Sequence, residues 1–554
     1  MAEVWLKHWP RGIPRSLTYP EISLPEILSA TTKKYPENTA LIFLGRRITY
    51  GELDQLCDSF ASALIGLGVE KGDRVALLLP NVPQFPICYY GALRAGAIAV
   101  PCSPLYKARE LQFQLTDSGA ETVVALDSLC GQVAEVCGET QIRNIVTTGL
   151  MDFASPVEGT STKEVDAFEA AGRFESVSLK ELLAEHGEAP PKVSIDASKD
   201  PALLQYTGGT TGVPKAAVLT HRNLVANTFQ FGSWLQVLRE GGEVVLAALP
   251  YFHIFGMTVA LNVPVLKGAG IVLQPRFDAG EALRAIERYG VTFFPGVPTM
   301  FIAVLNHPKA ASSNLRSVRL CISGASPLPV EVMRRLEAAT GGVVAEGYGL
   351  TEASPVTHCN PVDDMGKVRV GSIGLPIPDT EAKIVDVDDG ETELAADEVG
   401  ELVVRGPQVM AGYWNRPLDT EQTLRGGWLY TGDIAKRDED GYFYIVDRKK
   451  DMINVSGLKV WPREVEAVLC EHPAVKEAGV IGVHDPYRGE AVKAFVVLRE
   501  GFEGKISAAE LMRFCEEKMA VFKVPSQVEF VEQLPRTAIG KLLRRTLKEK
   551  AARR

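Results

Sequence analysis

The sequence predicts an α/β protein with three parts: a large N-terminal domain of doubly wound α/β subdomains, a small β-barrel-like subdomain and a small α+β C-terminal domain. The length of 554 residues exceeds what one hydrophobic core usually supports, so more than one domain is expected. Apolar runs of strand length alternate with helix-like segments over residues 49–130 and 243–323, which is typical of a parallel sheet with crossover helices. Short alternating strands with turn residues follow over 371–405 and predict the small β-subdomain.

The first α/β stretch begins at a helix start, because Thr49 and Glu52 have the spacing of a capping box. Its predicted buried strands are 75–79, 98–100 and 122–126, and helix-like segments separate them. The predicted strands of the second stretch are 243–248, 271–273, 291–294 and 318–323. Between the two stretches, residues 150–190 are polar and small, and we predict a long surface loop there.

A run of charges, Asp447-Arg448-Lys449-Lys450-Asp451, separates two different patterns. It follows a predicted strand at 443–446, and an α+β pattern comes after it. Pro462 stands where a helix would begin, which is a favoured position for proline. The α+β pattern consists of strands at 477–483 and 492–498 and a helix near 508–518. We therefore predict an N-terminal domain at 1–446, a linker at 447–450 and a C-terminal domain at 451–554.

The composition, 46% hydrophobic and 23% charged, is that of a soluble globular protein, and the formal net charge of −10 argues against a nucleic-acid binder. Nine scattered cysteines without zinc-ligand spacing indicate a reduced, cytoplasmic location. No signal peptide is recognised at the N-terminus. The longest apolar stretch, 254–266, is too short to span a bilayer, so a buried core segment and at most peripheral membrane contact are expected.

The sharpest chemical signal is Tyr206-Thr-Gly-Gly-Thr-Thr-Gly-Val-Pro-Lys215. Its three glycines allow backbone amides to approach an anion closely, its threonines add donors, and Lys215 adds a cation. The segment is not a Walker A loop, because no Gly-Lys-Ser/Thr ends it. An ordinary glycine-rich turn is the alternative, and the length and composition of the segment favour phosphate binding.

Six further segments follow this loop in order along the chain. They are Ser323-Gly-Ala-Ser-Pro-Leu328, Glu346-Gly-Tyr-Gly-Leu-Thr-Glu352, Tyr430-Thr-Gly-Asp433, Asp447-Arg448, Asn454-Val-Ser-Gly-Leu-Lys459 and Pro535-Arg-Thr-Ala-Ile-Gly-Lys541. With these motifs the chain resembles the adenylate-forming superfamily of acyl-CoA synthetases, luciferases and peptide-synthetase adenylation domains, over about residues 25–545. The passages around 101–119 and 454–466 are similar to the bacterial long-chain fatty acid ligases of that superfamily.

The resemblance implies a site for ATP and AMP. Tyr348 would offer a flat face to adenine, Asp433 would accept the ribose hydroxyls, and Arg448 would contact ribose or phosphates. Taken alone, each of these residue types is common in turns and linkers. The full set implied for ATP and AMP is Thr207, Gly208, Gly209, Thr210, Thr211, Gly212, Lys215, Gly324, Ala325, Ser326, Glu346, Gly347, Tyr348, Gly349, Leu350, Thr351, Asp433, Arg448 and Lys541.

The resemblance also implies Mg²⁺ held by Thr211 and Glu352, since a carboxylate is a suitable ligand for this ion beside phosphate oxygens. Lys541 would be the adenylation lysine and would stabilise the charge that builds up during attack on the α-phosphate. The catalytic residues implied in this way are Lys541, Glu352, Lys215 and His253.

For the acyl group, the resemblance implies a pocket formed by His253, Phe255, Val297, Gly324 and Gly349. A lone histidine in an apolar run is as readily a core residue, and core packing is the alternative for segment 293–301 as well. The pantetheine of CoA would pass Ser456, Gly457 and Leu458, and Lys450 would be the hinge.

Together these features predict a long-chain fatty acid:CoA ligase that uses ATP, CoA and Mg²⁺. The acid would attack ATP to give an acyl-adenylate and pyrophosphate, and CoA would then form the thioester and release AMP. The alternatives are a medium-chain or aryl acid substrate, an enzyme that loads a free-standing carrier protein, and a nucleotide-binding protein without catalysis. A homodimer is the oligomeric state considered.

Overall fold

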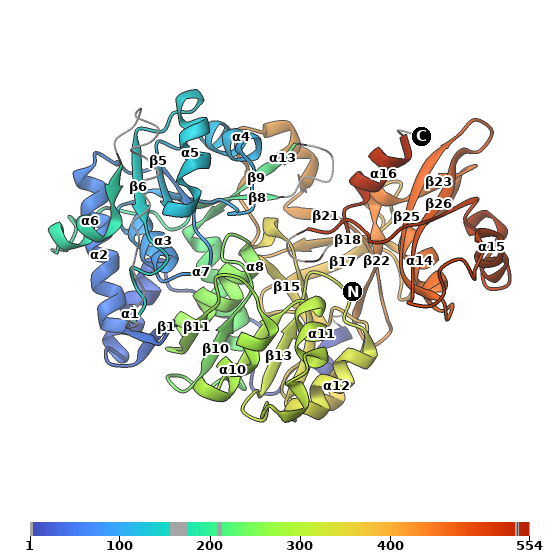
Figure 1. Cartoon of the computed structure of the whole chain (residues 1–554), viewed down its shortest axis with the longest axis horizontal. Helices are drawn as coiled ribbons and strands as arrows, with labels where there is room; N and C mark the ends of the chain where they lie inside the picture. Colours follow the sequence, from blue (N-terminus) through green and yellow to red (C-terminus); the bar gives the residue numbers. More distant parts are fainter. Residues whose placement is uncertain are drawn as a thin grey trace. The chain divides into compact units, whose positions relative to one another are not determined.

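Four β-sheets organise the described part of the chain in this computed structural model, which covers residues 4–155, 176–187, 189–207, 213–537, 540 and 542–552. The chain divides into two compact units (Figure 1). The larger unit consists of His8–Glu381 and Arg405–Leu429. The smaller unit consists of Met1–Lys7, Ala382–Val404 and Tyr430–Arg554. The predicted boundary at 447–450 stays a prediction.

Two extended sheets form the larger unit. The first contains β1 (Thr39–Phe43), β2 (Arg46–Thr49), β10 (Val244–Ala247), β11 (Gly270–Leu273), β12 (Phe293–Gly296), β13 (Leu320–Ser323), β14 (Val343–Gly349), β15 (Val356–Cys359) and β16 (Leu375–Pro376). The second contains β3 (Arg74–Leu78), β4 (Ile98–Pro101), β5 (Thr122–Leu126), β6 (Asn144–Thr148), β7 (Val177–Ser178), β8 (Pro201–Thr207), β9 (Lys215–Thr220) and β19 (Gly412–Tyr413).

The strand orders are β16-β15-β14-β13-β12-β10-β11-β1-β2 and β19-β9-β8-β4-β3-β5-β6-β7, and the central strands of both sheets are parallel. In the first sheet β10 lies between β11 and β12, and in the second β3 lies between β4 and β5. Such a reversal of strand order opens a crevice at the carboxyl ends of the strands. The predicted doubly wound α/β architecture is confirmed.

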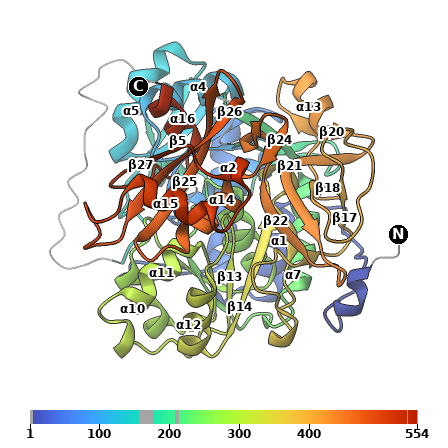
Figure 2. The same ribbon diagram turned by 90° about the vertical axis from the view of Figure 1, so that its right-hand side faces the viewer.

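Helices connect these strands. They are α1 (Pro25–Lys34), α2 (Tyr50–Gly66), α3 (Gln84–Arg94), α4 (Ala108–Ser118), α5 (Cys130–Val136), α6 (Leu179–Glu185), α7 (His221–Trp234), α8 (Ile254–Met257), α9 (Val263–Leu266), α10 (Ala279–Tyr289), α11 (Pro298–Asn306), α12 (Val330–Thr340) and α13 (Pro417–Thr423). The predicted capping box is present, since Thr49 and Glu52 each accept the other's backbone N–H. Helices α10, α11 and α12 lie side by side over the first sheet (Figures 1 and 2). The apolar stretch 254–266 is a buried helical segment, as expected.

The prediction of a surface loop over all of 150–190 is wrong for its last part. Val177–Ser178 pairs with β6 as β7, and α6 follows directly. Leu179 and Leu182 are buried in this short helix, so two apolar residues at helical spacing are enough to attach it to the unit. Residues 156–175 lie outside the described part of the chain.

The smaller unit contains two further sheets. The predicted β-subdomain consists mainly of β17 (Glu381–Val385), β18 (Gly400–Arg405), β21 (Trp428–Arg437) and β22 (Phe443–Arg448). The short strand β20 (Leu424–Arg425), which extends the same sheet, belongs to the larger unit. The C-terminal sheet contains β23 (Ile453–Val455), β24 (Leu458–Val460), β25 (Val475–Asp485), β26 (Gly489–Leu498) and β27 (Gln527–Phe530). Its helices are α14 (Pro462–Cys470), which begins at proline as predicted, α15 (Ala508–Glu516) and α16 (Arg544–Ala552).

Both faces of the C-terminal sheet are covered. Val480 of β25 packs in one cluster with residues of α14 and α15, whereas the next residue, Ile481, packs in another with Leu547 of α16. Successive side chains of a strand point to opposite faces, so the alternation confirms the predicted α+β domain (Figure 2).

Among the helices in the described ranges, none combines the length and the apolar character that crossing a membrane would demand.

A buried amide joins the carboxyl ends of the two large sheets. Asn81 follows β3, and its Nδ2 donates to the carbonyl oxygens of Ala247 at 2.9 Å and Leu249 at 2.8 Å, just beyond β10. Its Oδ1 accepts the backbone N–H of Tyr251 at 2.8 Å. Asn81 is only 2% exposed. The side chain of Asn81 therefore attaches the segment that follows β10 of the first sheet to the end of β3 in the second sheet.

We predict that Asn81→Ala lowers the free energy of unfolding by roughly 3 kcal/mol, because the Leu249 carbonyl and the Tyr251 N–H lose their buried partner and the Ala247 carbonyl keeps only the Gln274 N–H. Unfolding in guanidinium chloride, followed by tryptophan fluorescence, measures the change. Asn306→Ala is the matched control, since the side chain of Asn306 accepts a hydrogen bond from Arg335 at the surface. Equal midpoints for the two variants would contradict the importance of this junction.

Candidate active site

Several candidate residues lie in one row at the carboxyl edge of the first sheet. In the register of β12, β13 and β14, Gly296 pairs with Ser323, and Ser323 pairs with Glu346. Val297 and Gly324 are therefore the next residues along their strands. The ring of Phe255 lies directly against Gly324, because a Cβ on that glycine would come within 2.9 Å of the Phe255 ring. The fold thus brings together three of the residues expected around the acyl group, Phe255, Val297 and Gly324.

The turn after β13 is held by a buried carboxylate. Ala325 has a φ of +68°, a backbone conformation that residues other than glycine rarely adopt. The carboxylate of Glu346 accepts the N–H of Leu328 at 2.9 Å and that of Gly371 at 3.2 Å. Burial raises the pKa of Glu346, and the two backbone donors oppose that shift. Glu346 therefore supports the backbone of the motif segment 323–328, and Ser326 lies within that supported turn.

Tyr348 and Gly349 end β14 beside its antiparallel neighbour β15. Tyr348 is opposite His358, and their rings make a tilted edge contact with centroids 6.0 Å apart. A Cβ on Gly349 would lie 2.2 Å from the carbonyl oxygen of Pro355, so only glycine fits there. The Leu350 N–H donates to that same oxygen at 3.0 Å. The chain is thereby directed into the short 3₁₀ turn Thr351–Ala353, which carries Glu352.

Tyr413 connects two candidates that are far apart in the sequence. Its hydroxyl donates to Glu352 Oε1 at 2.7 Å, and Lys215 Nζ lies 5.3 Å from the centroid of its ring. Lys215 is also ion-paired with Asp419 of α13. Strand β19 brings Tyr413 next to β9, where it pairs with Ala217. Burial and the charge of Glu352 raise the pKa of Tyr413, so the phenol keeps its proton and acts as the donor.

The expected phosphate-binding segment connects two antiparallel strands. Thr207 at the end of β8 is paired with Lys215 at the start of β9. Gly208, Gly209, Thr210, Thr211 and Gly212, on which the prediction mainly rested, lie outside the described residues. Strand β8, which leads into this segment, also contacts the residue before His253, since Gln205 Nε2 donates to the carbonyl oxygen of Phe252 at 2.9 Å.

His253 is the N-cap residue of α8, and its Nδ1 accepts the backbone N–H of Phe255 at 3.2 Å. This contact fixes the start of the helix that carries Phe255. The geometry therefore gives His253 a structural role next to the acyl candidates. Its catalytic role stays a prediction.

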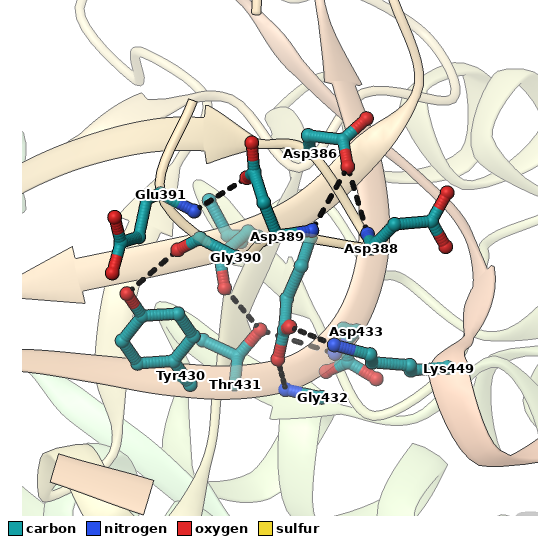
Figure 3. Close-up of polar contacts among 12 residues, drawn as sticks. Asp386, Asp388, Asp389, Gly390, Glu391, Tyr430, Thr431, Gly432, Asp433 and Lys449 are labelled. Atoms are coloured by element: carbon teal, nitrogen blue, oxygen red, sulfur yellow. Dashed lines mark hydrogen bonds and ion pairs between the residues drawn. The ribbon is translucent and has the colours of Figure 1, made fainter. Parts of the chain in front are cut away.

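In the smaller unit, Asp433 and Arg448 face each other across β21 and β22, with Arg448 Nε 3.1 Å from Asp433 Oδ1. Figure 3 shows the surrounding contacts, in which Asp433 N–H donates to Thr431 Oγ1 at 3.1 Å. Asp433 is buried and Arg448 is partly exposed. The two residues expected at the ribose are thus already paired with each other.

The segment expected near pantetheine is a tight hairpin turn between β23 and β24. Ser456 and Gly457 have φ values of +53° and +86°, which are the signs that a two-residue hairpin turn requires. Asn454 Oδ1 accepts the Gly457 N–H at 2.8 Å. Leu458 follows and is 49% exposed, so the turn presents an apolar side chain to its surroundings.

Lys541 lies outside the described residues. Near it, Arg536 and Leu542 form an isolated antiparallel bridge, and Arg536 Nη1 donates to the carbonyl oxygen of Gly540 at 2.8 Å. The role of Lys541 therefore stays a prediction from the sequence.

Tyr413 and Asp419 were not identified from the sequence. Gly412-Tyr-Trp-Asn415 has no periodic pattern, and Asp419 resembles any acidic residue in the first turn of a helix. Their importance comes from the pairing of β19 with β9, which joins distant parts of the chain. Only the glycine before Tyr413 gave a hint, since glycine in a short strand often marks close backbone contact.

Comparison with known proteins finds relatives over nearly the whole chain. A family model described as AMP-binding enzyme matches residues 28–414, and one described as AMP-binding enzyme C-terminal domain matches residues 464–541. A long-chain-fatty-acid–CoA ligase of Bacillus subtilis (strain 168) is 43% identical over 553 residues, which cover 98% of this chain and 97% of that protein. One of Salmonella typhimurium (strain LT2) is 40% identical over 561 residues, covering 100% and 99%. The crystal structure of ATP-bound MatB from Rhodopseudomonas palustris matches with a TM-score of 0.83 and 30% identity, covering 96% and 99%.

We predict that Tyr413→Phe weakens the binding of Mg²⁺ that accompanies ATP, because Glu352 loses the donor that orients it while the ring beside Lys215 is kept. The Mg²⁺ concentration for half-maximal ATP binding should rise about tenfold, the lower end of what is typical when the partner of a metal ligand is removed. Calorimetric titration with ATP at several Mg²⁺ concentrations measures it. Tyr19→Phe is the matched control, since that phenol also donates to a carboxylate, Asp379, in the same unit. A similar Mg²⁺ response in both variants would contradict the assignment.

Proposed function

Because the chain belongs to the AMP-binding enzyme family, we propose that it is a long-chain fatty acid–CoA ligase. It is an AMP-forming acid–thiol ligase, for which fatty acid, ATP and CoA are the substrates. The acid and ATP give an acyl-adenylate and pyrophosphate. CoA then takes the acyl group as a thioester, and AMP is released.

The observation that carries the proposal is the meeting of Lys215 and Glu352 at Tyr413. A cation for the phosphates and a carboxylate for the accompanying metal ion are what ATP requires of a protein. Here a single phenol donates to the carboxylate at 2.7 Å and faces the lysine with its ring. Their convergence at the end of a hairpin rich in glycine and threonine supports phosphate binding more strongly than either residue does alone.

In the first half-reaction, the carboxylate of the acid is itself the nucleophile, so the protein needs no serine or cysteine nucleophile. Attack on the α-phosphorus builds negative charge on its oxygens, and positioned cations stabilise that charge. We assign this work to Lys215 and Lys541. In this structure Lys215 is paired with Asp419, which keeps its charge compensated and its side chain close to Tyr413.

The residues present fit a magnesium ion. No group of three or more His, Cys, Asp and Glu side chains that could hold a metal occurs in the described ranges. Mg²⁺ bound to a nucleotide takes most of its ligands from phosphates and water, so one carboxylate is sufficient. Glu352 is such a carboxylate, and we propose that it holds the ion together with Thr211. The ion would neutralise phosphate charge, while Tyr413 keeps the orientation of Glu352.

For the acyl group, we propose that its alkyl chain lies along the apolar surface that Phe255 forms with the strand ends at Val297 and Gly324. These residues are apolar, and the absence of a side chain at Gly324 allows the Phe255 ring to reach the backbone. Gly349 and His253 complete the set. A long-chain acid is favoured by the names of the two relatives above, which share 40–43% identity with nearly the whole chain. A medium-chain or aryl acid is the second candidate, because chain length depends on pocket depth.

For the second half-reaction, we propose that the part of the chain after residue 450 rotates about Lys450. Lys541 would then leave the site, and the hairpin turn Ser456-Gly457-Leu458 would approach the pantetheine arm. The exposed Leu458 supports this role, because an apolar side chain suits the alkyl parts of pantetheine. Asp433 and Arg448 would hold the ribose through both steps. We also propose a cytoplasmic location, with at most peripheral membrane contact, and consider a homodimer.

The function is tested with a panel of acids of graded length and with aryl acids. Release of AMP is measured with and without CoA. We expect strong stimulation by CoA and the highest kcat/KM for long chains. An enzyme that loads a carrier protein would ignore CoA, and the absence of pyrophosphate exchange into ATP with every acid would refute the proposal.

We predict that Lys541→Ala lowers the acid-dependent exchange of pyrophosphate into ATP by about a hundredfold or more, because a positioned donor at the developing charge is removed. Conversion of synthetic acyl-adenylate by CoA should change by less than about threefold, since Lys541 is proposed to act only in the first step. Lys548→Ala, in the same basic C-terminal segment, is the control. Equal losses in both half-reactions would contradict the assigned role.

A further inference from the structure

A buried carboxylate of the smaller unit lies between the candidate ribose segment and the linker. Glu401 is in β18, and its side chain is only 4% exposed. Its Oε1 accepts the backbone N–H of Gly432 at 3.1 Å, and its Oε2 accepts from Lys449 Nζ at 2.7 Å. Figure 3 labels these two partners, Gly432 and Lys449. A buried charge needs such partners, because desolvation without them is costly. The two oxygens of one side chain thus hold two different segments.

The first segment presents Asp433. Gly432 has a φ of +69°, so β21 bends there in a way that favours glycine. Thr431 Oγ1 donates to the carbonyl oxygen of Leu402, the neighbour of Glu401, at 2.7 Å. The bend is therefore fixed to β18 at two points, and the position of the Asp433 carboxylate depends on both.

The second segment presents Arg448 and begins the linker. Arg448 faces Asp433 in the register of β21 and β22, and Lys449 is the next residue. The ion pair of Lys449 with Glu401 therefore holds the last residue before Lys450 to the β-subdomain. Because Glu401 is buried, breaking this pair would leave an uncompensated charge, so the pair is expected to persist when other contacts change.

On the other side of Lys450, the chain is held by the C-terminal domain. Asp451 Oδ2 lies 3.5 Å from Arg544 Nη1 of α16, and Arg544 Nη2 reaches both carboxylate oxygens of Glu466 in α14, at 2.7 and 2.8 Å. Lys450 is thus a single residue between two anchors, one on each part of the unit. Rotation about this residue leaves both anchors intact. Rotation would instead require breaking contacts between the β-subdomain and the C-terminal domain, such as the hydrogen bond that the Arg463 N–H donates to Asp447 Oδ2 at 2.7 Å.

We propose that Glu401 is a positioning residue that serves both half-reactions. Through Gly432 it holds Asp433 in place for the ribose of the nucleotide. Through Lys449 it keeps the start of the linker attached to the β-subdomain, so that rotation is confined to Lys450 and the second step is reached with the nucleotide site unchanged. This inference rests on the proposed function. It assigns a role to Glu401, which is not among the residues proposed to bind the fatty acid, ATP or CoA.

A double-mutant cycle with Glu401→Gln and Lys449→Met tests the proposal. In Glu401→Gln the amide oxygen still accepts from Gly432, and the charge toward Lys449 is lost. AMP affinity, measured by calorimetry, should stay within about threefold, whereas conversion of synthetic acyl-adenylate by CoA should fall about tenfold, a factor typical of contacting pairs. Lys449→Met should show the same pattern. The double variant should be no slower than the slower single variant, because both substitutions remove one interaction.

Glu401→Ala removes both contacts, and its AMP affinity should fall about tenfold as well, since misplacement of a binding group by about an ångström has effects of this size or larger. Lys436→Met is the matched control. Like Lys449, Lys436 is a lysine of the smaller unit that forms an ion pair, in this case with Asp397 at 3.1 Å. The Lys436–Asp397 pair is exposed and does not involve the linker. It should leave AMP affinity and both half-reactions unchanged.

Two results would overturn the proposal: wild-type AMP affinity in Glu401→Ala, or multiplicative losses in the Glu401→Gln and Lys449→Met cycle. If Glu401→Ala does not fold, as judged by its thermal unfolding, the cycle alone decides. If the unaltered protein exchanges no pyrophosphate with any acid, the proposed function fails. The AMP affinities of the variants then still test the link between Glu401 and Asp433.

Discussion

The larger unit depends on two mostly parallel sheets whose carboxyl ends meet, and the buried Asn81 joins them with three hydrogen bonds. Its amide uses two donors and one acceptor on the segment from Ala247 to Tyr251. That segment leads directly to His253 and Phe255. A crevice at a strand reversal is a general property of doubly wound sheets. In this chain Asn81 links two such crevices, so the segment that leads to the acyl candidates is attached to both sheets.

The candidate site combines backbone that needs glycine with a small number of oriented charges. Gly324 and Gly349 allow contacts of Phe255 and Pro355 with the backbone that any Cβ would prevent. The charged groups are each held by a second residue: Glu352 by Tyr413, Lys215 by Asp419, and Asp433 by Arg448. Pairing of this kind positions charged groups before a ligand is present.

Much of the fold could be predicted from the sequence. Continuous apolar runs located the buried strands, the capping box at Thr49 located α2, and Pro462 located the start of α14, because each of these signals is local. The helix α6 was missed since it is short and follows a polar segment. The candidate site was predicted by the motifs that the chain shares with its family. The sequence did not predict the roles of Tyr413, Asp419 and Glu401, because these roles come from pairing between distant strands, which no local pattern reveals.

A domain that rotates between two reaction steps must move as a rigid body, and the nucleotide site must not change with it. These requirements conflict if Arg448 binds the ribose as proposed, because Lys449 of the proposed linker is the next residue. Glu401 resolves the conflict, since it holds Lys449 with one oxygen and the bend before Asp433 with the other. Arg544 has the corresponding role for Asp451 on the far side. With both neighbours anchored by ion pairs, the proposed rotation would be left to the backbone of Lys450. In this proposal the position of the pivot follows from the two anchors, and the flexibility of the linker's own sequence is secondary.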